Sequence, residues 1–201
     1  MGRAARAPRV DGRRLRSTRT RAAILEALLA LVRDGRVVPT APQIAARAGV
    51  SLRTVAQHFP TRDDLFAAAA TAYREIAPRT DVVDVAAPLA TRIATFAGLR
   101  AEVLEVTAPY RLTATTMAAQ SPAVADGLRK ASRRRRAEVA AAFAPELGAL
   151  PDRARIELLD GLDVVAGGRT WDALRQDLRL GPRVAQARLE LLLGAVLAAA
   201  R

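Results

Sequence analysis

Four polar side chains in one short segment, residues 51–59, carry the hydrogen-bond donors that DNA recognition requires. They are Arg53, Thr54, Gln57 and His58. Arginine pairs with the acceptors on a guanine edge and glutamine with an adenine edge, whereas hydroxyl and imidazole groups can meet base edges or phosphates. A solvated helix face would more often mix Glu and Lys, yet this segment has no acidic residue. The pattern favours contact with DNA, with Arg53 or Gln57 touching the bases.

Two short helices joined by a tight turn, over residues 40–59, are predicted to position these side chains. Thr40 and Gln43 have the spacing of a capping box at the start of the first helix, and we expect both to meet the DNA backbone. Gly49 ends that helix, because glycine adopts the left-handed conformation without strain. Ser51 caps the second helix and joins the predicted DNA-binding residues. This arrangement predicts a helix-turn-helix, whose second helix enters a major groove.

Apolar residues at helical spacing are predicted to hold the second helix against the rest of the domain. Leu52, Val55 and Phe59 recur on one apolar stripe, and Val55 and Phe59 are expected to pack inward. Thr61 then caps another helix, which joins this domain to the remainder of the chain. Arg62, at the start of that helix, is expected to contact a phosphate, although a solvated charge is the alternative interpretation.

Several spaced residues together resemble the DNA-binding domain of the TetR family of transcriptional regulators. They are Ile44-Ala45, Ala48-Gly49-Val50-Ser51, Thr54-Val55, His58-Phe59, Thr61-Arg62 and Leu65. Upstream, the run Arg21–Leu25 resembles the opening of the family's first helix, so the resemblance covers about residues 17–77. The chain departs from the family at Arg53, where a glycine is frequent, and at Ala56, where an aromatic residue commonly touches a phosphate. The resemblance therefore implies a similar DNA-binding head in which Arg53 replaces the charge of one lost contact.

The sequence before this head, residues 1–16, has few large apolar residues and is predicted to be a mobile basic arm. Ser17 or Thr18 is expected to cap the first long helix, and Asp34-Gly35 to end it. Two interpretations of the arm stay open. It is either a solubilising tail or an arm that follows a groove or the phosphates beside the helix-turn-helix.

The composition of the 201-residue chain predicts an all-α protein. Hydrophobic residues make up 51% and aromatic residues 3%, so the core is expected to consist mainly of Ala, Leu and Val. The chain has no cysteine and one histidine, which excludes disulfides, thiolate metal sites and histidine-based metal clusters. No apolar run reaches the length of a membrane span. We expect a cytoplasmic bacterial protein, associated with the nucleoid when bound to DNA.

The net charge of +12 is concentrated in the predicted head. Residues 1–77 hold 14 arginines and 6 acids, whereas residues 78–201 hold 18 basic and 14 acidic residues. Counterion release from phosphates would favour such a distribution. The dense run at residues 132–136 wraps around its helix and is predicted to be solvated, with a second nucleic-acid patch as the alternative. A basic helical protein that binds nucleic acid or acidic surfaces without sequence specificity remains the alternative function.

The remainder, residues 78–201, is predicted to be a helical body that begins after a proline-containing boundary at residues 78–88. Prolines and glycines divide it into helices expected near residues 87–107, from Pro109, from Ser121-Pro122 to Phe143, from Pro151 to Val165 with a continuation after Gly167-Gly168, and from Pro182 to Ala200. No glycine-rich phosphate loop or nucleophile elbow occurs, so we expect neither an enzyme nor a cofactor.

The last two long helices have apolar residues on more than one face. In residues 189–197 and 156–165 such residues cover a wider arc than one-sided packing needs. The family resemblance implies that these helices pair with their copies in a homodimer, which would read a palindromic operator in double-stranded DNA. Ordinary core helices in a monomer are the alternative.

The resemblance also implies that the body binds a small-molecule effector which releases a repressor from its operator. Such an effector must bind two states of the protein with different affinity. The candidates for lining its pocket are Phe96, Tyr110, Arg111, Met117, Phe143 and Trp171. Each of these residue types is more often part of a simple packed core, so the effector-binding residues are unassigned.

Overall fold

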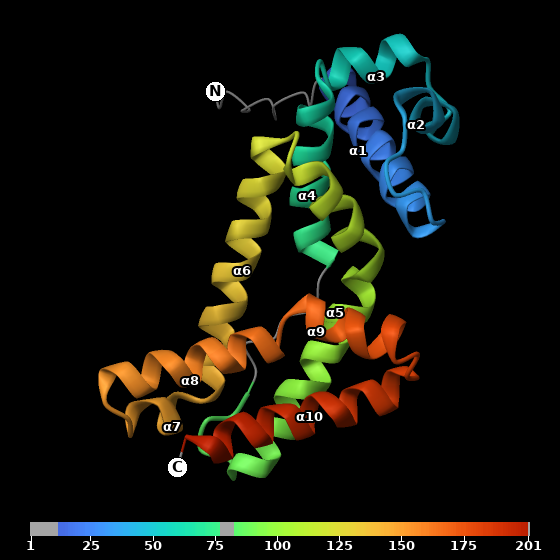
Figure 1. Ribbon diagram of the computed structural model, residues 1–201. Coiled ribbons are helices and arrows are strands. Elements are labelled where there is room, and N and C mark those ends of the chain that lie inside the picture. Colours follow the sequence, from blue (N-terminus) through green and yellow to red (C-terminus); the bar gives the residue numbers. More distant parts are fainter. Residues whose placement is uncertain (1–11, 77–82, 201) are drawn as a thin grey trace, which may run out of the picture.

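The computed structural model describes residues 12–76 and 83–200, and every regular element within these ranges is a helix (Figure 1). The elements are α1 (Gly12–Arg33), α2 (Ala41–Ala48), α3 (Leu52–His58), α4 (Arg62–Ile76), α5 (Leu89–Ala118), α6 (Pro122–Ala142), α7 (Ala144–Gly148), α8 (Asp152–Val165), α9 (Gly168–Asp172), the single π-helical turn η1 (Ala173–Asp177) and α10 (Pro182–Ala199). The predicted all-α class is confirmed. Among the described residues, no helix is long and apolar enough to cross a membrane.

The first helix begins earlier than predicted. It is already helical at Gly12, and Thr18 lies inside it, where its hydroxyl donates to the carbonyl of Arg14 at 3.0 Å. The predicted cap at Ser17 or Thr18 is therefore wrong, and residues 12–16 of the predicted arm are helical. Arginine and leucine are good helix formers, and extending a helix that is already packed avoids the cost of nucleation. Residues 1–11 lie outside the described part of the chain, as do residues 78–82 of the predicted boundary.

The helix α5 runs unbroken for 30 residues through Pro109, so the helix break predicted there is wrong. A proline inside a helix removes one backbone hydrogen bond, and its ring crowds the preceding turn. Contacts made along α5 with α1, α6, α9 and α10 oppose this local cost. The short helix α7, between α6 and α8, has no counterpart among the predicted helices.

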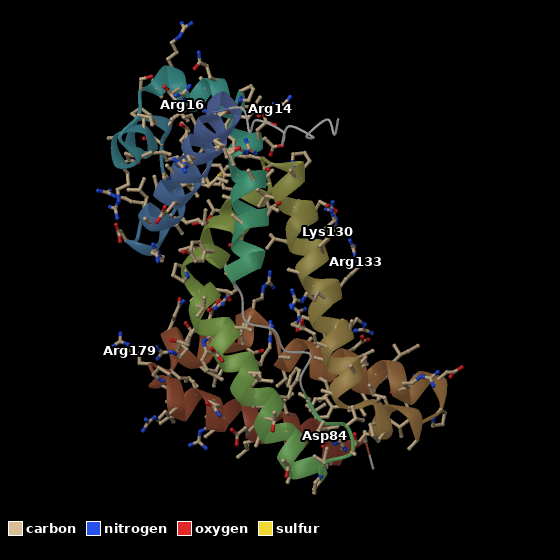
Figure 2. The ribbon with its side chains drawn as sticks, turned by 180° about the vertical axis from the view of Figure 1, so that it is seen from behind. Arg14, Arg16, Asp84, Lys130, Arg133 and Arg179 are labelled. Carbon is tan, nitrogen blue, oxygen red and sulfur yellow. The ribbon has the colours of Figure 1, made fainter. Side chains whose placement is uncertain are left out.

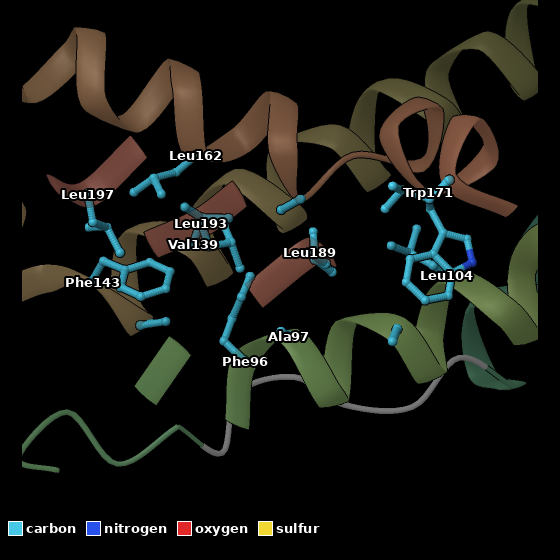
Figure 3. Close-up of a cluster of buried hydrophobic side chains, with 14 of the residues drawn as sticks. Phe96, Ala97, Leu104, Val139, Phe143, Leu162, Trp171, Leu189, Leu193 and Leu197 are labelled. Atoms are coloured by element: carbon cyan, nitrogen blue, oxygen red, sulfur yellow. The ribbon is translucent and has the colours of Figure 1, made fainter. Parts of the chain in front are cut away.

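Two hydrophobic clusters form the interior. In the body, Phe96 and Phe143 meet edge to face with ring centroids 5.5 Å apart, and Leu189 and Leu193 of α10 and Trp171 of α9 belong to the same cluster (Figure 3). Three of the candidate effector-lining residues thus lie in this packed core.

The second cluster belongs to the head but extends into the body. It gathers the buried faces of α1 to α4, and it also includes Tyr110 and Met117 of α5 and Val124 of α6. Head and body therefore share one hydrophobic interface. The upper halves of α5 and α6 are part of it, and α4 and α6 lie side by side (Figure 1).

The arginine run on α6 is only partly solvated. Arg135 binds Asp163 at 2.7 Å and Arg136 binds Asp160 at 2.6 Å, so two of the four arginines join α6 to α8. The prediction of a purely solvated surface is wrong for this pair. Arg133 is exposed and projects from the outer side of α6 (Figure 2).

Candidate nucleic-acid interface

The turn between α2 and α3 is built as the sequence predicts. The backbone N–H of Thr40 donates to Oε1 of Gln43 at 2.9 Å, within a capping box at the start of α2. Gly49 ends α2 with φ 66°, a conformation that favours glycine. Ser51 caps α3, because its Oγ accepts the backbone N–H of Thr54 at 3.0 Å. These three features are local, and the last two set the angle at which α3 leaves the turn.

The buried side of α3 is narrower than its apolar stripe. Val55 and, just after the helix, Phe59 are buried in the head cluster as expected. Leu52, the third residue of the stripe, is 51% exposed and lies outside that cluster. Successive helical residues are turned by about 100°, which places Leu52 beside the buried row rather than within it. A helix of seven residues with a single buried position, Val55, leaves most of its circumference exposed.

Two of the three remaining rows of side chains on α3 are polar. Arg53 and Gln57 form the central row, opposite Val55, and both are exposed. No hydrogen bond or ion pair involves either side chain among the described residues. Thr54 and His58 form one flank and are half-buried. The role of Thr54 and His58 in DNA binding stays a prediction, like that of the other predicted DNA-binding residues. The side chains of the central row carry the donors that are free to bond base edges.

The half-buried flank is held by contacts within the head. The hydroxyls of Thr54 and Ser51 lie 2.8 Å apart in a hydrogen bond. At the other end of α3, the carbonyl of His58 accepts a hydrogen bond from Nη1 of Arg21 at 3.1 Å. The guanidinium of Arg21 also lies 4.2 Å from the ring centroid of Phe59. Arg21 of α1 therefore bonds the last residue of α3 and stacks on the residue that follows.

Sequence reasoning included Arg21 only within the resemblance to the family's first helix and gave it no role. The two residues that it contacts lie 37 and 38 positions away, and no pattern in the sequence connects a helix end with an arginine at that separation. The sequence gives only an indirect indication that α3 needs such a partner. His58 ends α3 with a carbonyl that has no partner within the helix, and a nearby cation is one favourable partner for such a group.

The start of α4 carries a second local cap and a contact with the body. Thr61 and Asp64 bond each other reciprocally, since the backbone N–H of each donates to the other's side chain at 3.1 Å. Arg62 is exposed, with its guanidinium 5.5 Å above the ring of Phe66. Asp63 accepts a hydrogen bond from the hydroxyl of Ser121, at the start of α6. The contact of Arg62 with a phosphate stays a prediction, while the adjacent Asp63 holds α4 to the body.

Basic side chains surround this end of the molecule. Arg14, Arg16 and Arg19 of α1 are exposed, and the first two lie at the end that carries α3 (Figure 2). Arg47 of α2 pairs with Asp34 at 3.0 Å on the surface. Residues 40–60 contain no acid. The surface around α3 therefore presents a positive field to an approaching polyanion.

A small apolar cavity of about 50 Å³ lies where the head meets the body. Leu28 of α1 and Phe66 of α4 line one side, and Tyr110 and Thr113 of α5 line the other. Burial raises the pKa of the Tyr110 phenol. Binding sites for small molecules usually measure several hundred Å³, so this cavity would have to expand to accept such a ligand. Tyr110 is the one predicted effector-lining residue that this cavity includes.

A comparison with protein families identifies the helix-turn-helix. Residues 39–69 match the family model described as bacterial regulatory proteins, tetR family. This span covers α2, α3 and the first half of α4, so the resemblance predicted from the sequence is confirmed there. No curated protein matches the chain significantly.

Solved structures share the whole fold at low sequence identity. A transcriptional regulator from Rhodococcus sp. Rha1 is 22% identical, with a TM-score of 0.65 over 91% of this chain and 96% of its own. A proposed transcriptional regulator from Pseudomonas aeruginosa PAO1 is also 22% identical, with a TM-score of 0.66 over 89% and 90%. A proposed TetR-family regulator from Mesorhizobium loti is 18% identical, with a TM-score of 0.61 over 92% and 98%. The fold of head and body together is thus one found in such regulators.

Proposed function

We propose that this chain, a DNA-binding transcriptional regulator with the tetR-family helix-turn-helix, is a homodimeric repressor that a small ligand releases from a palindromic operator. The observation that carries the proposal is the central row of α3. Arg53 and Gln57 are exposed, free of partners among the described residues and held at a fixed angle by capped turns. Such a row suits the edges of base pairs in a major groove.

Each of the predicted DNA-binding residues has a distinct role in this proposed recognition of DNA. Arg53 is suited to two acceptors of a guanine and Gln57 to an adenine, and each such pair discriminates by about 1–3 kcal/mol. The remaining predicted residues would bond phosphates or the edges of flanking bases, which fixes the register without carrying most of the sequence information. They are Thr40, Gln43, Ser51, Thr54, His58 and Arg62.

Exposed apolar residues on α8 and α10 support a dimer through these helices. Ile156 of α8 is 55% exposed and Leu191 of α10 is 59% exposed, although the two helices pack against each other. At their contact a Cβ on Gly161 would lie 3.1 Å from Cγ1 of Val196, so the glycine permits a close approach. Two copies of this pair would form a four-helix interface, and two-fold symmetry would match a palindromic operator.

Effector release would act on the junction between head and body. The hydroxyl of Thr113 on α5 donates to the carbonyl of Val37, between α1 and α2, at 2.7 Å. Asp63 and Ser121 make the second polar contact across this junction. A ligand that enlarges the cavity beside Thr113 would strain both contacts and shift the angle between α3 and the body. It would release DNA only to the extent that it binds the shifted state more tightly.

Selection of bound fragments from a genomic library, at two salt concentrations, tests this function. A palindromic motif that persists at the higher salt is expected. Fragments without a shared motif, lost together as salt rises, would instead mean that positive charge alone binds DNA.

A variant of the central row sharpens the same test. Arg53→Ala is expected to weaken binding to the selected motif by about 10- to 100-fold, chiefly at one base pair. Arg179→Ala removes an exposed arginine at the side of the body, between η1 and α10, and serves as the control (Figure 2). A loss for Arg53→Ala that is equal on all sequences would favour the diffuse electrostatic alternative.

A further inference from the structure

The second flank of α3 is apolar and exposed. Leu52 and Ala56 are one turn apart, at positions i and i+4, and therefore form a row along the helix. This row adjoins the central row of Arg53 and Gln57, on the side away from Thr54 and His58. Both members are exposed, and the head cluster buries neither.

Leu52 belongs to neither hydrophobic cluster. The residue is 51% exposed, whereas Val55 of the next row is buried. Single exposed leucines are common on protein surfaces and by themselves need no explanation. Leu52 differs from such residues in its position, because it shares an exposed helix face with two free hydrogen-bond donors.

DNA offers one apolar group to a helix in its major groove, the C5-methyl group of thymine. We propose that Leu52 contacts this methyl group and so specifies a thymine in each operator half-site. This inference rests on the proposed function and deepens it. The occupant is DNA rather than an apolar protein surface, because the adjoining row carries Arg53 and residues 40–60 hold no acid.

The shapes of the two side chains set how many bases the row can read. Successive turns of a helix advance by about 5.4 Å, so Leu52 and Ala56 face different base pairs. Ala56 ends at its Cβ and projects little beyond the backbone, whereas Leu52 extends toward the groove floor. The row therefore specifies one thymine per half-site through Leu52, and Ala56 leaves space for α3 to approach closely.

Replacing thymine by deoxyuridine removes only the methyl group and tests the contact directly. In the operator found by fragment selection, each thymine of a half-site is replaced in turn and the dissociation constant is measured by fluorescence anisotropy at fixed salt. Burial of one methyl group is equivalent to about a fourfold change in affinity, so one position is expected to show about this loss in the wild-type protein. Leu52→Ala is expected to bind the natural operator about as weakly as the wild type binds the deoxyuridine operator. Replacing the same thymine by deoxyuridine should not weaken the binding of Leu52→Ala further.

Controls separate this inference from the function on which it rests. Leu112→Ala truncates a leucine that is 56% exposed on α5 of the body, and it should keep the wild-type response to deoxyuridine. Two outcomes would overturn the thymine contact alone. One is a clear operator motif with no thymine in the half-site. The other is an equal loss of affinity on deoxyuridine replacement in the wild type and in Leu52→Ala. Fragments without any shared motif would overturn both the contact and the proposed function.

Discussion

Arg21 is predicted to hold the reading helix in place without touching a base. It lies on α1 and reaches the last residue of α3, where it donates to the carbonyl of His58 at 3.1 Å and stacks 4.2 Å from the ring centroid of Phe59. Helices shorter than about 12 residues are marginal in isolation, and α3 has seven. The order of α3 must therefore come from its caps and its contacts with α1 and α2. Arg21→Met keeps much of the aliphatic length and removes the charge and the donors.

The size of the effect follows from the contacts that are lost. An exposed cation over an aromatic ring contributes about 0.5–1 kcal/mol, and a cation at a helix C-terminus about 0.3–1 kcal/mol. The hydrogen bond to His58 adds about 0.5–1 kcal/mol at an exposed site. Because one guanidinium makes all three contacts, their energies overlap, and we expect a total of about 1–2 kcal/mol. Arg21→Lys keeps the charge but loses the planar stack, so its effect should be intermediate.

Amide hydrogen exchange without DNA measures this effect apart from any direct contact of Arg21 with phosphate. For Arg21→Met, protection of the α3 amides is expected to fall by about 5- to 30-fold, while the body amides stay unchanged. Arg47→Met, which removes an arginine of the head paired with Asp34 on the surface, should leave α3 protection near its wild-type value. Unchanged α3 protection in Arg21→Met would refute the positioning role.

Two further predictions concern the body. Replacing both Ile156 and Leu191 by aspartate is expected to give a monomer in sedimentation equilibrium, because it places charges in the proposed interface, whereas Leu178→Asp, at a residue 64% exposed outside α8 and α10, should not. A dimer that persists in the double variant would exclude this interface. Hydrogen bonds from Arg175 at 2.7 Å and from the Trp171 indole at 2.8 Å keep the pKa of Glu105 below its ordinary value of 4.5. The stabilising contribution of the Glu105 carboxylate should therefore be complete above about pH 4.5 and decline as the pH falls toward the lowered pKa. The urea midpoint of unfolding should then fall more steeply with decreasing pH in the wild type than in Glu105→Gln. Equal dependence of the two midpoints on pH would contradict this.

Local features of the helix-turn-helix were predictable because their causes lie within a few residues. Capping by Ser51 depends on one side chain and an amide three positions later. The end of α2 at Gly49 depends on one residue that tolerates a positive φ. Neither feature needs a partner from elsewhere in the chain, so spacing alone identifies both.

Features set by tertiary packing were not predictable in this way. The rule that proline interrupts a helix is a statement about local cost, and at Pro109 the packing of α5 against four other elements outweighs it. The ion pair of Arg92 with Glu146 joins α5 to α7 across 54 positions, and buries the arginine. No spacing rule relates two residues at that separation, and the sequence alone did not single out either one.

The direction of Leu52 illustrates why the family of a DNA-binding domain can be identified when its operator cannot. Periodicity assigns Leu52 to the same apolar stripe as Val55, but the structure buries only the row that faces the head cluster. A stripe found by periodicity is wide enough to include a flanking row, and on α3 that flank belongs to the face that we propose contacts DNA bases. For residues that specify bases, the apolar pattern is therefore least informative about whether the side chain is buried or exposed. Arg53 and Ala56, where the chain departs from the tetR-family pattern that it resembles, lie on the same exposed surface as Leu52. Residues of the buried row preserve the fold of the head, while the exposed rows are free to change with the DNA sequence that is read.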